Sequence, residues 1–275
     1  MSEWFFVRRG LANGVMNAGT AVGGLVLPLI LPSIIQPNGT QITLRYLAVA
    51  VFASLLAVGS GARWSTNQSF WLILVVTTLQ GFAYFLPILY LPTFAKDMNM
   101  NEEQASLALA LLNGSSVVSR ISLGQLSDIF NPWLLTTFTL AGTSIFTFVL
   151  WGAVTTNMAT LSIYAVIFGA LAGGFSSLWT GFVRPIARDD PISATTMLGM
   201  LMLSRGLGNV LSTPVSSALL TGSALNYVQS GFQHGSRWTR LIVYIGAMFA
   251  GAAMVGLVGW KRERGMSSVL LHRTP

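Results

Sequence analysis

The stretch 70-FWLILVVTTLQGFAYFLPILYLPTF-94 runs for 25 residues without one charged side chain. A helix needs roughly 20 predominantly apolar residues to cross the hydrocarbon core of a bilayer. The stretch therefore predicts a membrane-spanning helix over residues 70–94. Three small or polar residues, Gln80, Gly81 and Tyr84, interrupt its apolar character near the middle.

Similar apolar segments recur along the rest of the chain. They cover residues 11–35, 45–61, 104–126, 133–152, 161–182, 195–220 and 241–260. Short polar connections separate them, and Asn131-Pro132 is one clear break because proline ends a preceding helix. The pattern predicts an all-α polytopic membrane protein, a bundle of about eight transmembrane helices.

The composition excludes several classes of protein. Of the 275 residues, 53% are hydrophobic and only 8% are charged, against about 25% charged in a soluble domain. A soluble enzyme, a disordered chain or a nucleic-acid binder with a basic surface would need more charge. The chain has no cysteine and two histidines, so we expect no metal site, no cofactor, no enzymatic activity and no nucleic-acid partner.

The distribution of Lys and Arg predicts the orientation in the membrane. With eight spans, one side holds nine basic residues, namely Arg8, Arg9, Arg63, Arg184, Arg188, Lys261, Arg262, Arg264 and Arg273, and the other holds four, namely Arg45, Lys96, Arg237 and Arg240. Cytoplasmic loops are enriched in such residues. Both termini are therefore predicted to be cytoplasmic.

Arg120 is a charged residue inside a predicted span. Such a charge costs a few kcal/mol in the hydrocarbon and usually faces a polar cavity. Ser116 and Asn113 share its helical face, and a carboxylate could pair with the guanidinium bidentately. We expect these three residues to bind substrate. Alternatively, Arg120 snorkels to the interface or braces Asp128.

Other candidates are less distinctive. Arg205 and Asn209 in the seventh span indicate a gate or cavity, although a hydrogen bond from Arg205 to a backbone carbonyl on another helix is slightly favoured. Gln80 and Tyr84 are further substrate-binding candidates, with helix packing as the alternative. Gly124 and Asp128 form either a cytoplasmic latch or a simple helix end.

Two stretches resemble the monocarboxylate transporter-like family of the major facilitator superfamily. Residues 4–14, WFFVRRGLANG, followed by Ala18-Gly19 and Gly23, resemble the signature aromatic-Phe-x-Arg-Arg-x-Leu-Ala-x-Gly that opens the fifth of twelve helices in that family. Residues 113–128 are similar to the eighth helix, with its Arg and its Gly-x-Leu-x-Asp end. The resemblance is greatest to the fungal branch.

The resemblance implies that this chain corresponds to helices five to twelve. Residues 1–61 would be two helices of the N-terminal half, 62–69 a cytoplasmic connection, 70–260 a complete C-terminal six-helix bundle and 261–275 a basic cytoplasmic tail. In the family, the eighth-helix Arg, here Arg120, pairs with the substrate carboxylate. Animal members carry an Asp one turn earlier, where this chain has Ser116.

The expected function is alternating-access transport of a small organic anion, monocarboxylate-like, impaired because four helices are lacking. The alternatives are a non-transporting membrane protein that associates with or regulates a full-length relative, and an incomplete gene product. The expected partners are the lipid bilayer, the anion, and a homodimeric copy or a full-length relative. The resemblance makes the plasma membrane the default location.

Overall fold

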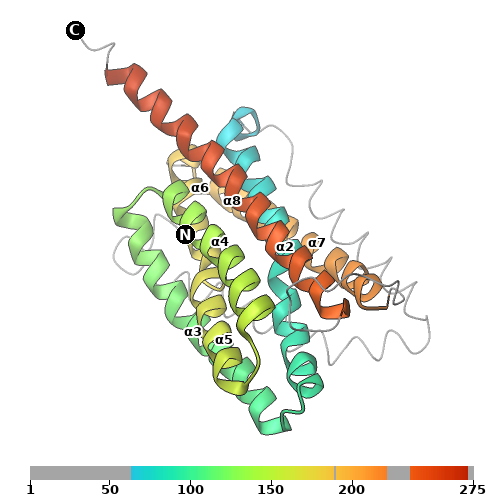
Figure 1. Ribbon diagram of the computed structural model, residues 1–275. Helices are drawn as coiled ribbons and strands as arrows, with labels where there is room; N and C mark the ends of the chain where they lie inside the picture. The colour runs from blue at the N-terminus through green and yellow to red at the C-terminus, as the bar shows by residue number, and fades with distance from the viewer. Residues whose placement is uncertain (1–62, 189, 222–235, 272–275) are drawn as a thin grey trace. The chain divides into compact units, whose positions relative to one another are not determined.

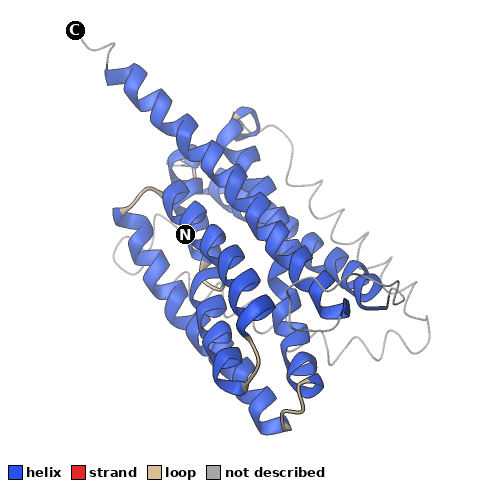
Figure 2. Ribbon diagram, in the orientation of Figure 1, coloured by secondary structure: helices blue, strands red, loops and turns tan. Residues whose placement is uncertain are grey.

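The computed structural model describes residues 63–188, 190–221 and 236–271. Within these ranges every regular element is a helix (Figure 2), which confirms the predicted all-α class. The predicted spans 11–35 and 45–61 lie outside the described residues. The chain divides into two compact units, residues 1–63 with 189–196, and residues 64–188 with 197–275. The second unit contains most of the described helical residues.

The predicted spans from residue 70 onward each correspond to a helical segment. The elements are η1 (Arg63–Thr66), α2 (Gln68–Asp97), α3 (Glu102–Ile129), α4 (Pro132–Phe146), η2 (Thr147–Val154), α5 (Met158–Ala172), η3 (Phe175–Leu178), α6 (Trp179–Ala187), α7 (Pro191–Thr221) and α8 (Ser236–Leu271). Five of the described segments are long and apolar enough to cross a membrane. The 31-residue α7 has the length, but it is not one of those five.

Asparagine side chains start four of these helices. Asn67, Asn101, Asn131 and Asn157 each accept a hydrogen bond from a backbone N–H of the first turn, which satisfies a donor that has no partner within the helix. Pro132 follows Asn131 at the first helical position, where proline is well tolerated. The break predicted at Asn131-Pro132 is therefore correct.

The structure adds detail at two predicted boundaries. The predicted span 161–182 lies within the membrane-length segment Met158–Ala187, but the helix is interrupted there, since α5 ends at Ala172 and the chain passes through the 3₁₀ turn η3 before α6 begins. The basic residues from 261 onward continue α8 as helix to Leu271. Basic residues favour the last turns of a helix, and Arg264 stacks on Trp260 with its guanidinium carbon 4.3 Å from the ring centroid.

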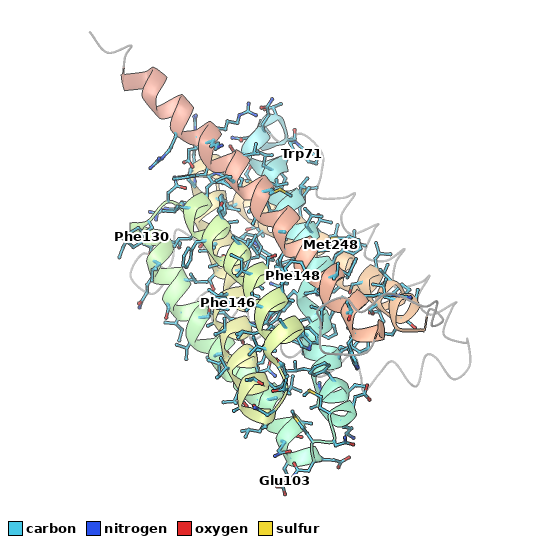
Figure 3. The ribbon with its side chains drawn as sticks, viewed as in Figure 1. Trp71, Glu103, Phe130, Phe146, Phe148 and Met248 are labelled. Carbon is cyan, nitrogen blue, oxygen red and sulfur yellow. The ribbon has the colours of Figure 1, made fainter. Side chains whose placement is uncertain are left out.

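Each of the long helices α2, α3, α4, α5 and α8 packs against at least two of the others. α3 lies beside α5, α2 beside α8 and α3, and α4 beside α8 and α5 (Figure 1). Aromatic rings fill the interior: Trp151 lies 5.7 Å from Phe94 and 5.1 Å from Tyr164, measured between ring centroids. Large apolar side chains such as Trp71, Phe130 and Phe146 are exposed on the outside (Figure 3), as expected for helices that face lipid.

Small residues allow α3 and α5 to approach closely. A Cβ atom added at Gly169 would overlap the Ser115 hydroxyl and the Leu112 backbone carbonyl, and one added at Gly173 would overlap Ser116. The Ser119 hydroxyl donates to the Ala170 carbonyl across the same contact. Interfaces of this kind associate helices in lipid by van der Waals packing and interhelical hydrogen bonds.

We predict that Gly169→Ala lowers the thermal stability of the detergent-solubilised protein. The new methyl group meets a backbone carbonyl that cannot move aside, and overpacking of this kind costs about 1–3 kcal/mol. The matched control is Gly114→Ala on α3, where an added Cβ has nothing within 4 Å and alanine is favoured in a helix by up to about 1 kcal/mol. Equal melting temperatures for the two variants, measured by fluorescence-detected size exclusion, would contradict this account of the interface.

Candidate functional site

Helices α2 and α7 cross at a pair of glycines. A Cβ on Gly81 of α2 would lie 2.8 Å from the backbone oxygen of Arg205, and a Cβ on Gly208 of α7 would lie 2.9 Å from the Gly81 carbonyl carbon. Real side chains do not tolerate such distances to backbone atoms. We call this contact the α2–α7 crossing.

Polar side chains join the two helices along the crossing. The hydroxyl oxygens of Thr78 and Ser204 are 2.5 Å apart, and Ser204 also donates to the Leu74 carbonyl at 3.3 Å. Further along, the oxygens of Tyr90 and Ser216 are 3.1 Å apart. Residue numbers rise together along the two helices in these pairs, which shows that α2 and α7 run parallel. Residues at the same level along the two helix axes therefore contact each other.

Arg205 is placed against aromatic rings by this crossing. Its guanidinium carbon lies 4.3 Å from the centroid of the Tyr84 ring and 5.8 Å from that of Trp179. A cation over a ring face within about 6 Å is stabilised by the ring quadrupole, more strongly where water is excluded. Tyr84 and Trp179 are 7% and 3% exposed and Arg205 is half-buried, so the guanidinium is positioned by buried rings rather than by a described carboxylate.

A stripe of buried polar residues on α2 ends at Tyr84. Thr77, Gln80 and Tyr84 share one helical face, and Thr77 and Gln80 are fully buried. Neither the Thr77 hydroxyl nor either amide atom of Gln80 has a hydrogen-bond partner among the described residues, and the same holds for Asn209 Oδ1 on α7 and Trp179 Nε1 on α6. A buried polar group left unpaired costs about 1–3 kcal/mol, so these groups have capacity for a ligand.

Arg120 contacts the break between α5 and α6. Its Nε donates to the backbone carbonyl of Gly173 at 3.2 Å, and Gly173 is the C-cap residue that follows α5. The rest of the side chain is exposed. One predicted alternative was that Arg120 braces Asp128, but the hydrogen bond that the structure shows for Arg120 is the one to Gly173. We predicted an interhelical hydrogen bond to a backbone carbonyl for Arg205. In the structure Arg120 makes such a bond, whereas Arg205 contacts aromatic rings.

The other predicted residues of α3 are divided between the interface and the surface. Ser116 is buried, packs against Gly173 and donates to the Asn113 carbonyl at 2.7 Å. The Asn113 side chain is exposed, as is that of Asp128 near the end of the helix. Gly124 is half-buried and faces Ser177.

The structure therefore gathers Gln80, Tyr84, Arg205 and Asn209 at the α2–α7 crossing. Arg120 reaches the same region through Gly173, at the break that precedes Trp179. Trp179 belongs to this group but was not among the predicted site residues. The signal that could have identified it is the pair Gly173-Gly174, which breaks the helix just before it. Breaks in membrane helices often mark binding sites.

All six described acids lie away from this group. Asp97, Glu102, Glu103 and Asp128 lie at helix ends, Asp190 lies in a connection, and Glu263 lies in α8 beyond its apolar part. Asp97 accepts from Trp238 Nε1 at 2.9 Å, Lys96 donates to Glu102 at 2.9 Å, and Asn131 donates to Glu263 at 3.0 Å. Within the described residues, no three His, Cys, Asp or Glu side chains are grouped as metal ligands. The site thus offers two cations, neutral amides and aromatic rings.

We predict that a Thr78→Cys/Ser204→Cys variant cross-links on mild oxidation. The native hydroxyls are 2.5 Å apart, the two Cβ atoms of a disulfide are about 3.8 Å apart, and the chain has no native cysteine. The control pair Thr78→Cys/Ser212→Cys lies two turns out of register and should not cross-link. Labelling of the remaining thiols with a maleimide reports the extent of reaction.

Gly208→Leu should slow that cross-link, because its side chain forces α7 away from α2. Gly206→Leu on the same helix should not, since a Cβ there has nothing within 4 Å. Equal cross-linking rates in both backgrounds would show that the glycine contact does not set the helix separation.

Comparison with known proteins identifies the family. The model of the Major Facilitator Superfamily matches residues 1–213. Similar proteins include the Fujikurins efflux protein of Gibberella fujikuroi, 26% identical over 93% of this chain and 56% of its own length, and the MFS-type transporter hasB of Aspergillus fumigatus, 28% identical over 93% and 62%. The Aspyridones efflux protein apdF of Emericella nidulans is 24% identical over 94% and 54%.

The chain spans less than two thirds of the length of these relatives. They are fungal, in agreement with the fungal resemblance in the sequence, and their names describe efflux or MFS-type transport rather than monocarboxylate transport. The match to the family model covers most of the residues that form the α2–α7 crossing. The chain therefore belongs to the major facilitator superfamily, a family of multi-pass membrane transporters and not of enzymes.

Proposed function

We propose that this chain takes part in the transport of a small organic anion across a membrane by alternating access. The observation that supports the proposal is the position of Arg205, whose guanidinium carbon lies 4.3 Å from the centroid of the buried Tyr84 ring, in a segment that contains none of the described acids. An anion beside Arg205 gains a charge-assisted interaction. Arg120, bonded to the helix break that precedes Trp179, supplies the second positive charge of this mechanism.

The two arginines have different roles in this mechanism. Arg205 is fixed by Tyr84 and Trp179, so it supplies a preformed charge. Arg120 is exposed and bonded to the carbonyl of Gly173, so an arriving anion can recruit it and alter its contact with the helix break. Gln80 and Asn209 add neutral hydrogen-bonding groups beside the anion, and the exposed amide of Asn113 on α3 is a further such group. Ser116 and Gly124 lie against neighbouring residues of the α5–α6 region, and Asp128 lies near the end of α3.

Alternating access requires two helical halves that rock about a site between them. In our proposal, residues 70–260 form one six-helix half and residues 1–61 belong to the other, joined by the connection 62–69. The efflux named for two relatives favours outward movement of the anion. The plasma membrane as location and cytoplasmic termini, as the count of basic residues predicts, complete the proposal.

Uptake into proteoliposomes tests the transport function. We predict that vesicles containing the purified chain take up radiolabelled lactate or benzoate, and that Arg120→Gln and Arg205→Gln each reduce uptake about tenfold or more, because a charged hydrogen bond contributes about 1.5–3 kcal/mol. The control is Lys96→Gln, a cation paired with Glu102 at the helix end.

Uptake equal to that of the wild type in both arginine variants, at matched protein content, would refute the assigned roles. Co-purification with a full-length relative, with no uptake by the chain itself, would favour the regulatory alternative instead.

A further inference from the structure

The stacking of Arg205 leaves part of its guanidinium available. Its guanidinium carbon lies 4.3 Å from the centroid of the Tyr84 ring and 5.8 Å from that of Trp179. Its five N–H donors lie in the plane and point outward from the edge. These donors have the geometry that binds a carboxylate bidentately, and no described carboxylate forms a salt bridge with them.

Aromatic surface surrounds the cation on more than one side. The Phe168 ring is stacked on that of Tyr84 with centroids 6.2 Å apart, and the Phe175 ring meets Trp179 edge-on at 6.4 Å. These four rings come from α2, α5, η3 and α6, and all are buried. An anion bound at the edge of Arg205 lies next to this aromatic cluster, and its organic body contacts ring faces where the packed rings move apart. A flat conjugated body gains ring–ring contact there that a puckered aliphatic body does not.

Two neutral groups beside the cation also lack partners. The indole N–H of Trp179 is buried with no acceptor among the described residues, and so are both amide atoms of Gln80. Trp179 contacts Arg205 directly, and Gln80 precedes Tyr84 by one helical turn. A ligand with an acceptor oxygen can satisfy one of these donors while its negative charge pairs with Arg205. This observation is independent of the ring stacking and indicates a ligand in the same place.

We propose that Arg205, held between Tyr84 and Trp179, is the residue that binds the anion, and that the site selects a planar conjugated organic anion, such as an aromatic carboxylate or an enolate, over an aliphatic monocarboxylate. The inference rests on the proposed transport function and narrows its substrate class. It assigns the primary contact to α7, whereas the family resemblance assigns it to Arg120 on α3. Arg120 then acts as a positioning residue through Gly173, at the break just before η3 and Trp179.

Calorimetric binding to the purified full chain tests the inference with two matched probes. Benzoate and cyclohexanecarboxylate both carry one carboxylate on a six-carbon ring, but only benzoate is planar and aromatic. A merely hydrophobic site would favour cyclohexanecarboxylate, the more apolar of the two. We expect benzoate to bind about tenfold more tightly, the equivalent of about 1.4 kcal/mol.

Three substitutions separate the roles of the residues. Arg205→Lys keeps the charge but loses the planar group, so the affinity for benzoate should fall about tenfold and the ratio between the probes should approach one. Arg120→Lys should weaken both probes by a similar factor and preserve the ratio. Arg264→Lys is the control, because Arg264 stacks on Trp260 at the same 4.3 Å distance near the end of α8 and should leave both affinities unchanged.

Tyr84→Leu provides a second test that does not depend on the folding of the Arg205→Lys protein. It removes one covering ring without changing the charge, and it should reduce the ratio as well. A wild-type preference for cyclohexanecarboxylate, or an unchanged ratio in either the Arg205→Lys or the Tyr84→Leu protein, would overturn the inference and leave anion transport intact. Absence of binding by both probes, together with absence of uptake in vesicles, would overturn the proposed function as well.

Discussion

Close approach of helix backbones at glycine is the constraint on which the rest of this structure depends. In lipid, apolar side chains gain little by leaving one apolar environment for another, so helices associate where their surfaces fit closely. Gly81 with Gly208, and Gly169 with Gly173, provide such surfaces. The first pair fixes the register between α2 and α7 in which Arg205 contacts the Tyr84 ring. The second brings α3 near enough for Arg120 to reach the end of α5.

Helix separation also decides how each charge is accommodated. A guanidinium inside a membrane-spanning segment is costly without compensation, and the two arginines are compensated by different groups. Arg205 lies against rings, which offer an electrostatic attraction without a fixed negative charge. Arg120 uses a backbone carbonyl that the helix break leaves accessible. Neither solution neutralises the charge, so both arginines keep most of their attraction for an anion.

Much of the fold follows from the sequence by simple physical rules. Length and apolar character located the segments from residue 70 onward, and an asparagine cap with a following proline located the start of α4. The break after Ala172 was missed because an apolar run rich in glycine has the same composition whether or not its helix is continuous. The extension of α8 to Leu271 was missed because charged residues end a membrane span without ending a helix.

The sequence predicts which charged residues lie inside the membrane spans, but it does not predict which groups they contact. Charge inside an apolar segment singles out Arg120 and Arg205, but the partner of each depends on which helix lies opposite and how closely. The polar residue Ser116 packs against a glycine at a helix interface. In contrast, the Gln80 amide and the Trp179 indole N–H are buried without a hydrogen-bond partner among the described residues. Polarity alone cannot separate these cases. Hydrogen-bonding capacity that the described helices leave unused distinguishes a group kept for a ligand from one that holds helices together.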